Sequence, residues 1–221
     1  TAAEVTDGTL LAWVGDPQYF NGTDSLVSLP NNLFNTKASG AIEFTATVPN
    51  QNSAVFSLAS SADANSSLSV GFRDDSGDIR MRLLNIGGNV IEGNTVLTEG
   101  AVHVFRYEST GSAYKLYIDG NEETFSVVEG SNDGDWFSTE ATSTTLYSIG
   151  ALKRSSGTIL YYNGIINNLS VLDTNLTTVL FNVTGIGATP WNDTIGTSNG
   201  TPSNLGVDGT VSKWYDQSGN D

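Results

Sequence analysis

Carboxylates are the side chains most able to do chemistry in this chain, and they gather at two places. Asp74, Asp75 and Asp78 lie within one short stretch, and Glu122 is followed by Glu123 in another. Hydrolysis of a glycoside needs two carboxyl groups, one to protonate the leaving oxygen and one to attack or to activate water. Both clusters fall at expected turns, where carboxylates are normally solvated. We therefore predict that the chain is not an enzyme.

Metal chemistry has few candidate ligands. The sequence has no cysteine and one histidine, His103, so disulfides and thiolate metal sites are excluded and a structural zinc site lacks ligands. A bound metal would be a hard cation held by oxygen atoms, with calcium as the candidate. No ligand spacing is diagnostic, and we predict no metal and no cofactor; the oxygen ligands available for calcium are Asp24, Asp74, Asp75 and Asp78.

Aromatic and amide side chains suggest sugar binding instead. A sugar site commonly stacks a ring on the sugar and binds its hydroxyls with amide or carboxylate groups. Trp136 is the first candidate because it lies in a polar loop, "SNDGDWFSTE", although it could equally plug the open end of a sandwich. Tyr161, Tyr162 and Asn163 are the second group. Strand alternation would turn one of these tyrosines inward whatever the function.

The charge balance limits the partners. Net charge is −15, from 24 acidic and 9 basic residues. Such a field repels polyanions, so nucleic acid is excluded as a partner. No apolar run approaches the roughly 18 residues that a membrane-spanning helix needs, and we predict no membrane insertion.

The elements that position these side chains are strands, because apolar and polar residues alternate with a period of two along most of the chain. In "AIEFTATV" (41–48) an apolar face alternates with a polar one: Ile42, Phe44, Ala46 and Val48 against Glu43, Thr45 and Thr47. Similar patterns predict strands at 25–29, 53–59, 67–72, 78–84, 102–107, 114–118, 145–151 and 159–172. No segment has three turns of helical periodicity. The chain is predicted to be all-β.

Turn residues indicate antiparallel pairing. "RDDSGDIR" puts Ser76 and Gly77 between two strands, and "YIDGNEE" does the same with Asp119 and Gly120. Asp-Gly and Ser-Gly pairs accept the positive φ that tight hairpins need. Ten or so short strands with such turns predict a two-sheet antiparallel sandwich.

Three segments together resemble a known family. They are "YFNGTDSLVSLP" (19–30), "VHVFRYESTGSAYKLYIDGNEE" (102–123) and "YSIGALKRSSGTILYYNGIINNLSVLDTNLT" (147–177). In this order they are similar to the opening strand, central hairpin and closing strands of concanavalin A-like, laminin-G-like jelly rolls. The resemblance implies a jelly-roll sandwich. It leaves function open, because this superfamily contains lectins, adhesion modules, glycosidases and lyases.

The resemblance also bears on catalysis. Glycosidases of this fold carry Glu-x-Asp-x-x-Glu on one strand, and that pattern is missing from the sequence. His103 matches a family position that is ordinarily structural, so no Ser-His-Asp triad is proposed. Both points agree with the prediction of a non-enzymatic protein.

The C-terminal part differs in character. Residues 179–221 are crowded with Gly, Thr, Asn and Pro, and we predict an extension that begins after a jelly roll at 1–178. "VLFNV" (179–183) is a candidate edge strand. Trp191 and Trp214 argue against a disordered linker, and we predict that the extension docks on the sandwich or on another chain. The residues predicted to contact another module or subunit are Trp191, Trp214, Tyr215 and Gln217.

The end of the chain, "VSKWYDQSGND" (211–221), resembles a segment that precedes the jelly roll in related proteins. We therefore expect the chain to end where a second, similar module begins, or its tail to fill the equivalent place on a neighbouring subunit.

Two functions fit these features. Cysteine-free, acidic, Gly/Thr/Asn-rich jelly rolls are common in bacteriophage virion proteins and in bacterial surface proteins. The favoured hypothesis is a virion-surface structural or adhesion protein, contacting other virion or surface proteins, copies of itself as a homo-oligomer, or host glycans. The alternative is a carbohydrate-binding module of a secreted enzyme or adhesin, with an exposed aromatic platform around Trp136. A glycosidase is the least favoured. Either leading hypothesis places the protein on a virion surface or outside the cell.

Overall fold

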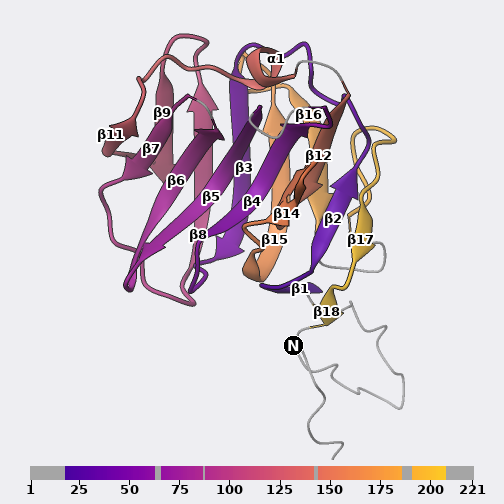
Figure 1. The fold of residues 1–221 in the computed structure, drawn as a ribbon, viewed down its shortest axis with the longest axis horizontal. Helices are drawn as coiled ribbons and strands as arrows, with labels where there is room; N and C mark the ends of the chain where they lie inside the picture. Colours follow the sequence, from indigo (N-terminus) through magenta and orange to yellow (C-terminus); the bar gives the residue numbers. More distant parts are fainter. Residues whose placement is uncertain (1–17, 63–65, 87, 142–143, 186–190, 208–221) are drawn as a thin grey trace, which may run out of the picture.

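Two sheets of antiparallel strands stack face to face in the computed structural model (Figure 1). The structure describes residues 18–62, 66–86, 88–141, 144–185 and 191–207. The predictions for Trp214, Tyr215 and Gln217, and for the segment 211–221 as a whole, lie outside these ranges. The all-β, two-sheet prediction is confirmed.

Each sheet has eight strands. Sheet A runs, in spatial order, through β10 (Asn121–Glu123), β9 (Tyr114–Ile118), β8 (Val102–Ser109), β3 (Gly40–Thr47), β15 (Asn163–Leu172), β1 (Gln18–Asn21) and β18 (Gly206–Val207), with β16 (Val179–Thr184) also paired to β15. Sheet B runs through β11 (Phe125–Glu129), β7 (Val90–Gly93), β6 (Asp78–Ile86), β5 (Ser67–Asp75), β4 (Ser53–Ser60), β12 (Thr145–Ile149), β2 (Leu26–Leu29) and β17 (Thr201–Ser203).

Alternation along the strands builds the core between the sheets. In β3, Ile42, Phe44 and Ala46 are buried, whereas Glu43 and Thr45 lie on the outer face of sheet A. The same alternation in both sheets buries one continuous cluster that is rich in aromatic rings, several of which meet edge to face. Because the core is filled from both sheets, the polar residues of each strand are left on the two outer faces.

The predicted hairpin turns form as expected. Ser76 and Gly77 have φ of 58° and 99° between β5 and β6, and Asp119 and Gly120 have φ of 51° and 79° between β9 and β10. Two consecutive positive φ values match the right-handed twist of the flanking strands. These turns fix the register of both hairpins.

The predicted strand at 159–172 is wrong at its start. A separate hairpin comes first, made of β13 (Leu152–Arg154) and β14 (Gly157–Ile159), and β15 begins only at Asn163. Leu160, with φ of 54°, interrupts the extended chain. The hairpin covers β4, where Leu152 packs on Ala54 and Ala59 in a small second cluster. The only helix in the described ranges is the single turn α1 (Phe137–Glu140).

The described part of the C-terminal extension belongs to the sandwich. β16 pairs with β15, which confirms the predicted edge strand at 179–183, and Phe181 and Val183 are fully buried in the common core. β17 then joins sheet B beside β2, and β18 joins sheet A beside β1. Within the described ranges, no helix has the length and apolarity to cross a bilayer.

Candidate functional site

Trp136 does not form an exposed platform. Its side chain is 1% exposed, and its ring stacks on Phe137 with centroids 4.8 Å apart. The loop before α1 folds inward, so the indole closes the end of the core instead of facing solvent. The prediction of a glycan platform at Trp136 is therefore wrong, and the alternative role as a plug is the one the structure shows.

The second predicted group is divided between core and surface. Tyr162 is fully buried, packs edge to face on Phe20, and donates a hydrogen bond to the backbone carbonyl of Thr47. Burial raises the pKa of its hydroxyl far above the usual range. Tyr161 is half-buried and lines neither of the two hollows described below. Asn163 alone of this group lines a surface hollow.

Trp191 is likewise a core residue. It is fully buried, packs edge to face on Phe20 with centroids 5.5 Å apart, and donates its indole N–H to the side-chain oxygen of Gln18. The contact predicted between modules or subunits is, in this chain, a contact with its own first described strand.

The outer face of sheet A brings together residues that the sequence leaves far apart. Glu43 on β3 is the Cα partner of Arg106 on β8, and Arg106 is in turn the partner of Tyr117 on β9. Core residues flank each of them along its strand, so all three side chains point outward. The register therefore places a carboxylate, a guanidinium and an aromatic ring side by side across three strands.

A groove of about 290 Å³ lies over these residues. The guanidinium carbon of Arg106 is 5.7 Å from the centroid of the Tyr117 ring. Its Nη2 is 3.3 Å from Oε2 of Glu108, and its Nη1 is 4.0 Å from Oε2 of Glu43. Exposed side-chain fractions of 9% for Glu108, 25% for Arg106 and 43% for Glu43 place Glu108 deepest and Glu43 nearest to solvent.

Tyr117 presents a neutral hydroxyl at this groove. Burial, and next the negative charge of Glu108, raise the pKa of Tyr117. A neutral phenol can both donate and accept a hydrogen bond, and its ring offers an apolar surface.

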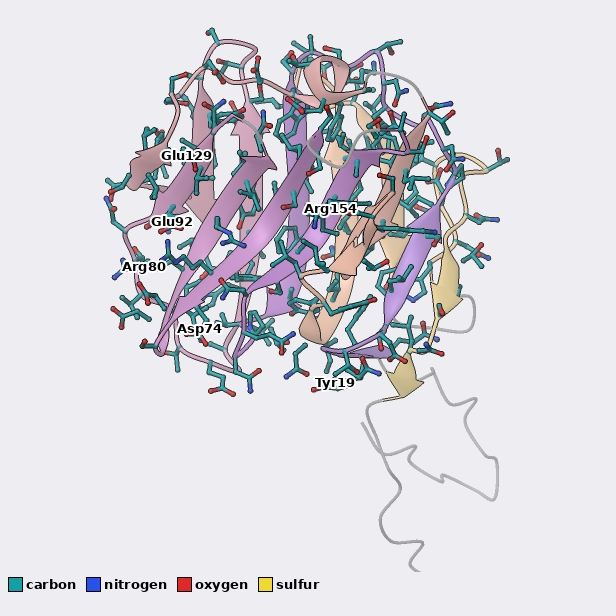
Figure 2. The ribbon with its side chains drawn as sticks, viewed as in Figure 1. Tyr19, Asp74, Arg80, Glu92, Glu129 and Arg154 are labelled. Carbon is teal, nitrogen blue, oxygen red and sulfur yellow. The ribbon has the colours of Figure 1, made fainter. Side chains whose placement is uncertain are left out.

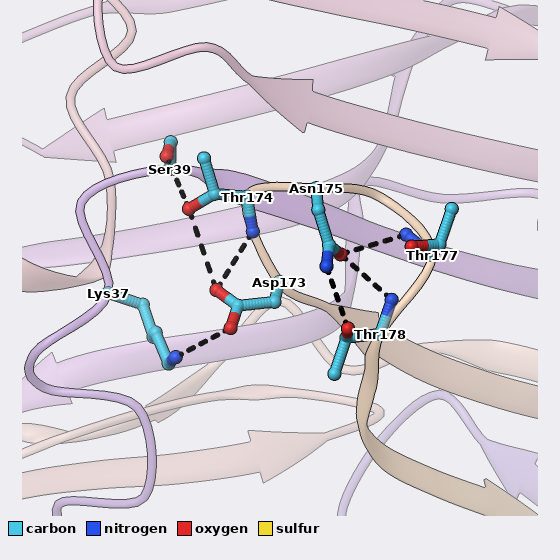
Figure 3. A network of polar contacts seen from close by, with 7 residues as sticks. All are labelled: Lys37, Ser39, Asp173, Thr174, Asn175, Thr177 and Thr178. Carbon is cyan, nitrogen blue, oxygen red and sulfur yellow. Dashed lines mark hydrogen bonds and ion pairs between the residues drawn. The ribbon is translucent and has the colours of Figure 1, made fainter.

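Leu176 closes one end of the groove, from the turn between β15 and β16. This leucine has φ of 57°, which is uncommon for a residue with a side chain. Figure 3 shows what holds the turn: the side-chain oxygen of Asn175 accepts from the backbone N–H of Thr177 and Thr178, at 3.1 and 2.9 Å. Next to it, Lys37 pairs with Asp173 at 3.0 Å. These bonds fix Leu176 in its position.

A second hollow, of about 240 Å³, lies at the rim of the same sheet face. Tyr19 of β1, Asn163 at the start of β15, and Asn50 and Glu99 from two loops line it. Nδ2 of Asn163 donates to Oδ1 of Asn50 at 2.8 Å, while Oδ1 of Asn163 accepts from the Tyr19 hydroxyl. Figure 2 shows Tyr19 at the rim, far from Arg80, Glu92 and Glu129.

The single histidine of the sequence is hydrogen-bonded to a carboxylate at a hairpin turn. Nδ1 of His103 is 2.7 Å from Oδ2 of Asp119, and the other oxygen of Asp119 accepts from the backbone N–H of Val104 at 2.9 Å. The pair holds the β9–β10 turn against β8, and its hydrogen bonds lower the pKa of Asp119. Among the described residues, no group of three or more His, Asp or Glu side chains is arranged to hold a metal ion.

Sequence reasoning missed Tyr117, Arg106, Glu43 and Glu108. The sequence does contain a signal for part of this group. The alternation in "YKLYI" turns Tyr117 away from the core. The short loop between β8 and β9 sets the register that pairs Tyr117 with Arg106. The pairing of Glu43 with Arg106 joins strands about 60 residues apart, and no local signal predicts such a register.

No family model matches the chain, and no curated protein matches its sequence. Solved structures do match in shape. A Bacteroides ovatus protein, described as a candidate carbohydrate-binding protein, superimposes with a TM-score of 0.61 at 13% identity, over 88% of this chain and 60% of that one. The fold is that of the concanavalin A-like jelly rolls.

Two further structures agree on the fold. The heptameric SAP-like pentraxin of Limulus polyphemus gives a TM-score of 0.53 at 14% identity, over 86% of this chain and 94% of the pentraxin. Domains LG4–5 of the mouse laminin α1 chain give 0.50 at 17% identity, over 78% of this chain and 48% of that one. The predicted laminin-G-like jelly roll is confirmed at the level of fold.

Proposed function

We propose that this chain is a carbohydrate-binding module and that sugars bind on the outer face of sheet A. The observation that carries the proposal is the groove in which the guanidinium of Arg106 lies beside the ring of Tyr117 and near the carboxylates of Glu43 and Glu108. The Bacteroides ovatus protein with the same fold is itself a candidate carbohydrate-binding protein, which supports this function.

The groove offers the groups that sugar recognition uses. The C–H face of a sugar ring packs on the ring of Tyr117, as saccharides commonly do on aromatic residues. Guanidinium N–H groups of Arg106 donate to hydroxyl oxygens, and the carboxylate of Glu43 accepts from hydroxyl hydrogens. Because the backbone of three paired strands fixes these residues, little conformational entropy is lost on binding.

The same geometry favours binding without catalysis. A glycosidase uses one carboxyl group as an acid and a second, independent one as a nucleophile or base. Here Glu43 and Glu108 both lie beside one guanidinium, which orients them as hydrogen-bonding groups. We propose that the groove binds sugar and releases it unchanged.

The location and the partners of this module are a second part of the proposal. The acidic, cysteine-free composition agrees with a place on a virion surface or outside the cell. The partners there would be host glycans, other surface proteins or further copies of the chain. The groove favours the carbohydrate-binding module over a purely structural virion protein, because a packing role does not require this combination of ring, guanidinium and carboxylates.

A glycan array tests the proposal. The protein should bind a defined subset of glycans saturably, and Tyr117→Ala should weaken binding of those glycans about ten-fold or more, equivalent to about 1.4 kcal/mol. Tyr117→Phe should retain most of the affinity because the ring remains. Tyr161→Ala is the matched comparison, since Tyr161 is a half-buried tyrosine outside both hollows.

Two results would overturn the proposal. One is an array on which the folded protein binds nothing. The other is glycan binding that survives Tyr117→Ala and is lost with Tyr161→Ala, which would move the site to the residues suggested by sequence.

A further inference from the structure

The groove and the rim hollow lie on one sheet face and share strand β3. β3 contributes Glu43 to the groove and Thr47 to the hollow. β8 contributes Val104 and Arg106 to the groove, and the residues just before β8, Glu99 and Gly100, line the hollow. Thr47 lies four positions after Glu43 on β3, a distance of about 13 Å at about 3.3 Å per residue.

The surface between the two hollows is partly apolar. Thr45 and Val104 are Cα partners there, and Val102 pairs with Thr47 one step nearer to the rim. Val102 is 53% exposed and Val104 is 38% exposed, so both valines offer apolar surface to solvent. Side chains of this kind pack against the apolar C–H faces of a ligand that crosses them.

The hollow has hydrogen-bonding groups still available. Asn163 is held between Tyr19 and Asn50, so the two amides are fixed in orientation. The Nδ2 group of Asn50 and the exposed carboxylate of Glu99 make no hydrogen bond or ion pair with any residue in the described ranges. Fixed amide donors beside a free carboxylate acceptor suit the hydroxyl groups of a sugar.

The charge of this surface selects among sugars. Glu43, Glu99 and Glu108 carry three carboxylates, against the one guanidinium of Arg106. With the −15 charge of the whole chain, this field disfavours uronic, sialylated and sulfated glycans.

From these observations we propose that groove and hollow are the two ends of one binding track for a linear, uncharged oligosaccharide. The sugar chain runs along β3 and β8, with one unit over Tyr117, the middle units over the exposed valines, and the far unit bound by Asn50, Asn163 and Glu99. This rests on the proposed function, because the groove supplies the first contact.

Calorimetric titration with neutral oligosaccharides of graded length tests the track. The probes are xylo-, cello- and manno-oligosaccharides, each from disaccharide to hexasaccharide. For the series that binds, affinity should rise about ten-fold or more between the disaccharide and the hexasaccharide. Asn50→Ala and Glu99→Gln should each remove most of this gain.

Asn52→Ala is the matched control. Asn52 lies on the same loop as Asn50, lines neither hollow, and makes only long hydrogen bonds, of 3.3 and 3.4 Å, to Asp74. This variant should bind the hexasaccharide as the wild type does.

The outcomes separate the two proposals. If the disaccharide and hexasaccharide bind equally tightly, or if the Asn50 and Glu99 variants keep the full gain, the track is refuted while sugar binding at the groove stands. Binding of uronate oligomers in preference to neutral ones would also refute it. If neither neutral nor charged oligosaccharides bind to the folded wild type, both proposals fail.

Discussion

The guanidinium of Arg106 lies over the ring of Tyr117, 5.7 Å from its centroid, and the two residues are Cα partners on neighbouring strands. The same guanidinium reaches Glu108 at 3.3 Å and Glu43 at 4.0 Å. One side chain therefore orders the aromatic and acidic groups of the groove. A cation over an aromatic face contributes roughly 0.5–1 kcal/mol at an exposed site.

Replacing Arg106 should affect both stability and binding. Arg106→Ala leaves the mostly buried Glu108 without its charged partner, and we expect the free energy of unfolding to fall by about 1–3 kcal/mol. Arg106→Lys keeps the charge but loses the planar group over Tyr117, so it should cost less than about 1 kcal/mol while still weakening glycan binding several-fold. Urea denaturation and calorimetry measure the two effects. Equal glycan affinity for Arg106→Lys and wild type would contradict the role of the planar guanidinium.

Trp191 ties the C-terminal segment to the start of the sandwich. Its ring is fully buried against Phe20, and its indole N–H is bonded to Gln18. Trp191→Ala should lower the free energy of unfolding by about 3–5 kcal/mol. Trp191→Phe keeps an aromatic ring and should cost clearly less. A thermal or urea transition that is unchanged in Trp191→Ala would show that residues 191–207 are not part of the folding unit.

Glu140 should make stability depend on pH. Its carboxyl group is buried beside Asn85, whose Nδ2 donates to it at 2.8 Å; burial raises its pKa, and Asp133 and Asp135 add to the rise. Ionisation of such a group costs more in the folded than in the unfolded protein. The cost is present above the folded pKa and disappears as pH falls towards the unfolded value of about 4.3.

Glu140→Gln tests whether the ionised carboxylate destabilises the folded protein, because the amide oxygen of Gln can still accept a hydrogen bond from Asn85. At pH 7 the variant should be more stable than the wild type by about 1 kcal/mol, and the difference should shrink as pH falls towards about 4.3. Urea denaturation across this range measures it. A variant that is less stable at pH 7, or a difference that grows in acid, would contradict the assignment.

Gly164 is required at the rim hollow. It has φ of +146°, and a Cβ added there would lie 2.3 Å from Oγ1 of Thr47, which accepts a hydrogen bond from the backbone N–H of Ile165 at 3.0 Å. Gly157 is the matched control, with φ of +132° and nothing within 4 Å of an added Cβ. Gly164→Ala should therefore destabilise the protein by about 1–3 kcal/mol more than Gly157→Ala does. Similar costs for the two variants would mean that only backbone conformation matters at this position.

Local pattern predicted most of the fold. Alternation in β3 assigned Phe44 to the core and Glu43 to the surface, and the turn residues Ser76 and Asp119 predicted their hairpins. These features depend on neighbours within a few residues, so the sequence displays them directly.

The site was less predictable because it depends on packing and register. Trp136 lies in a polar loop by sequence, yet the loop folds its indole into the core. For Trp191 the sequence left open contact with the sandwich, another module or another subunit, and the structure places its ring in the core of its own sandwich. Tyr117 becomes significant only when β3, β8 and β9 align, since a shift of one residue would turn Glu43 into the core.

The most direct test of sugar binding on sheet A is to map amide chemical shifts during titration with the tightest-binding oligosaccharide. The account predicts that the largest shifts occur at Glu43, Arg106 and Tyr117, with little change at Arg80 and Glu92 on the outer face of sheet B. Shifts concentrated around Arg80 and Glu92, with sheet A unaffected, would contradict it.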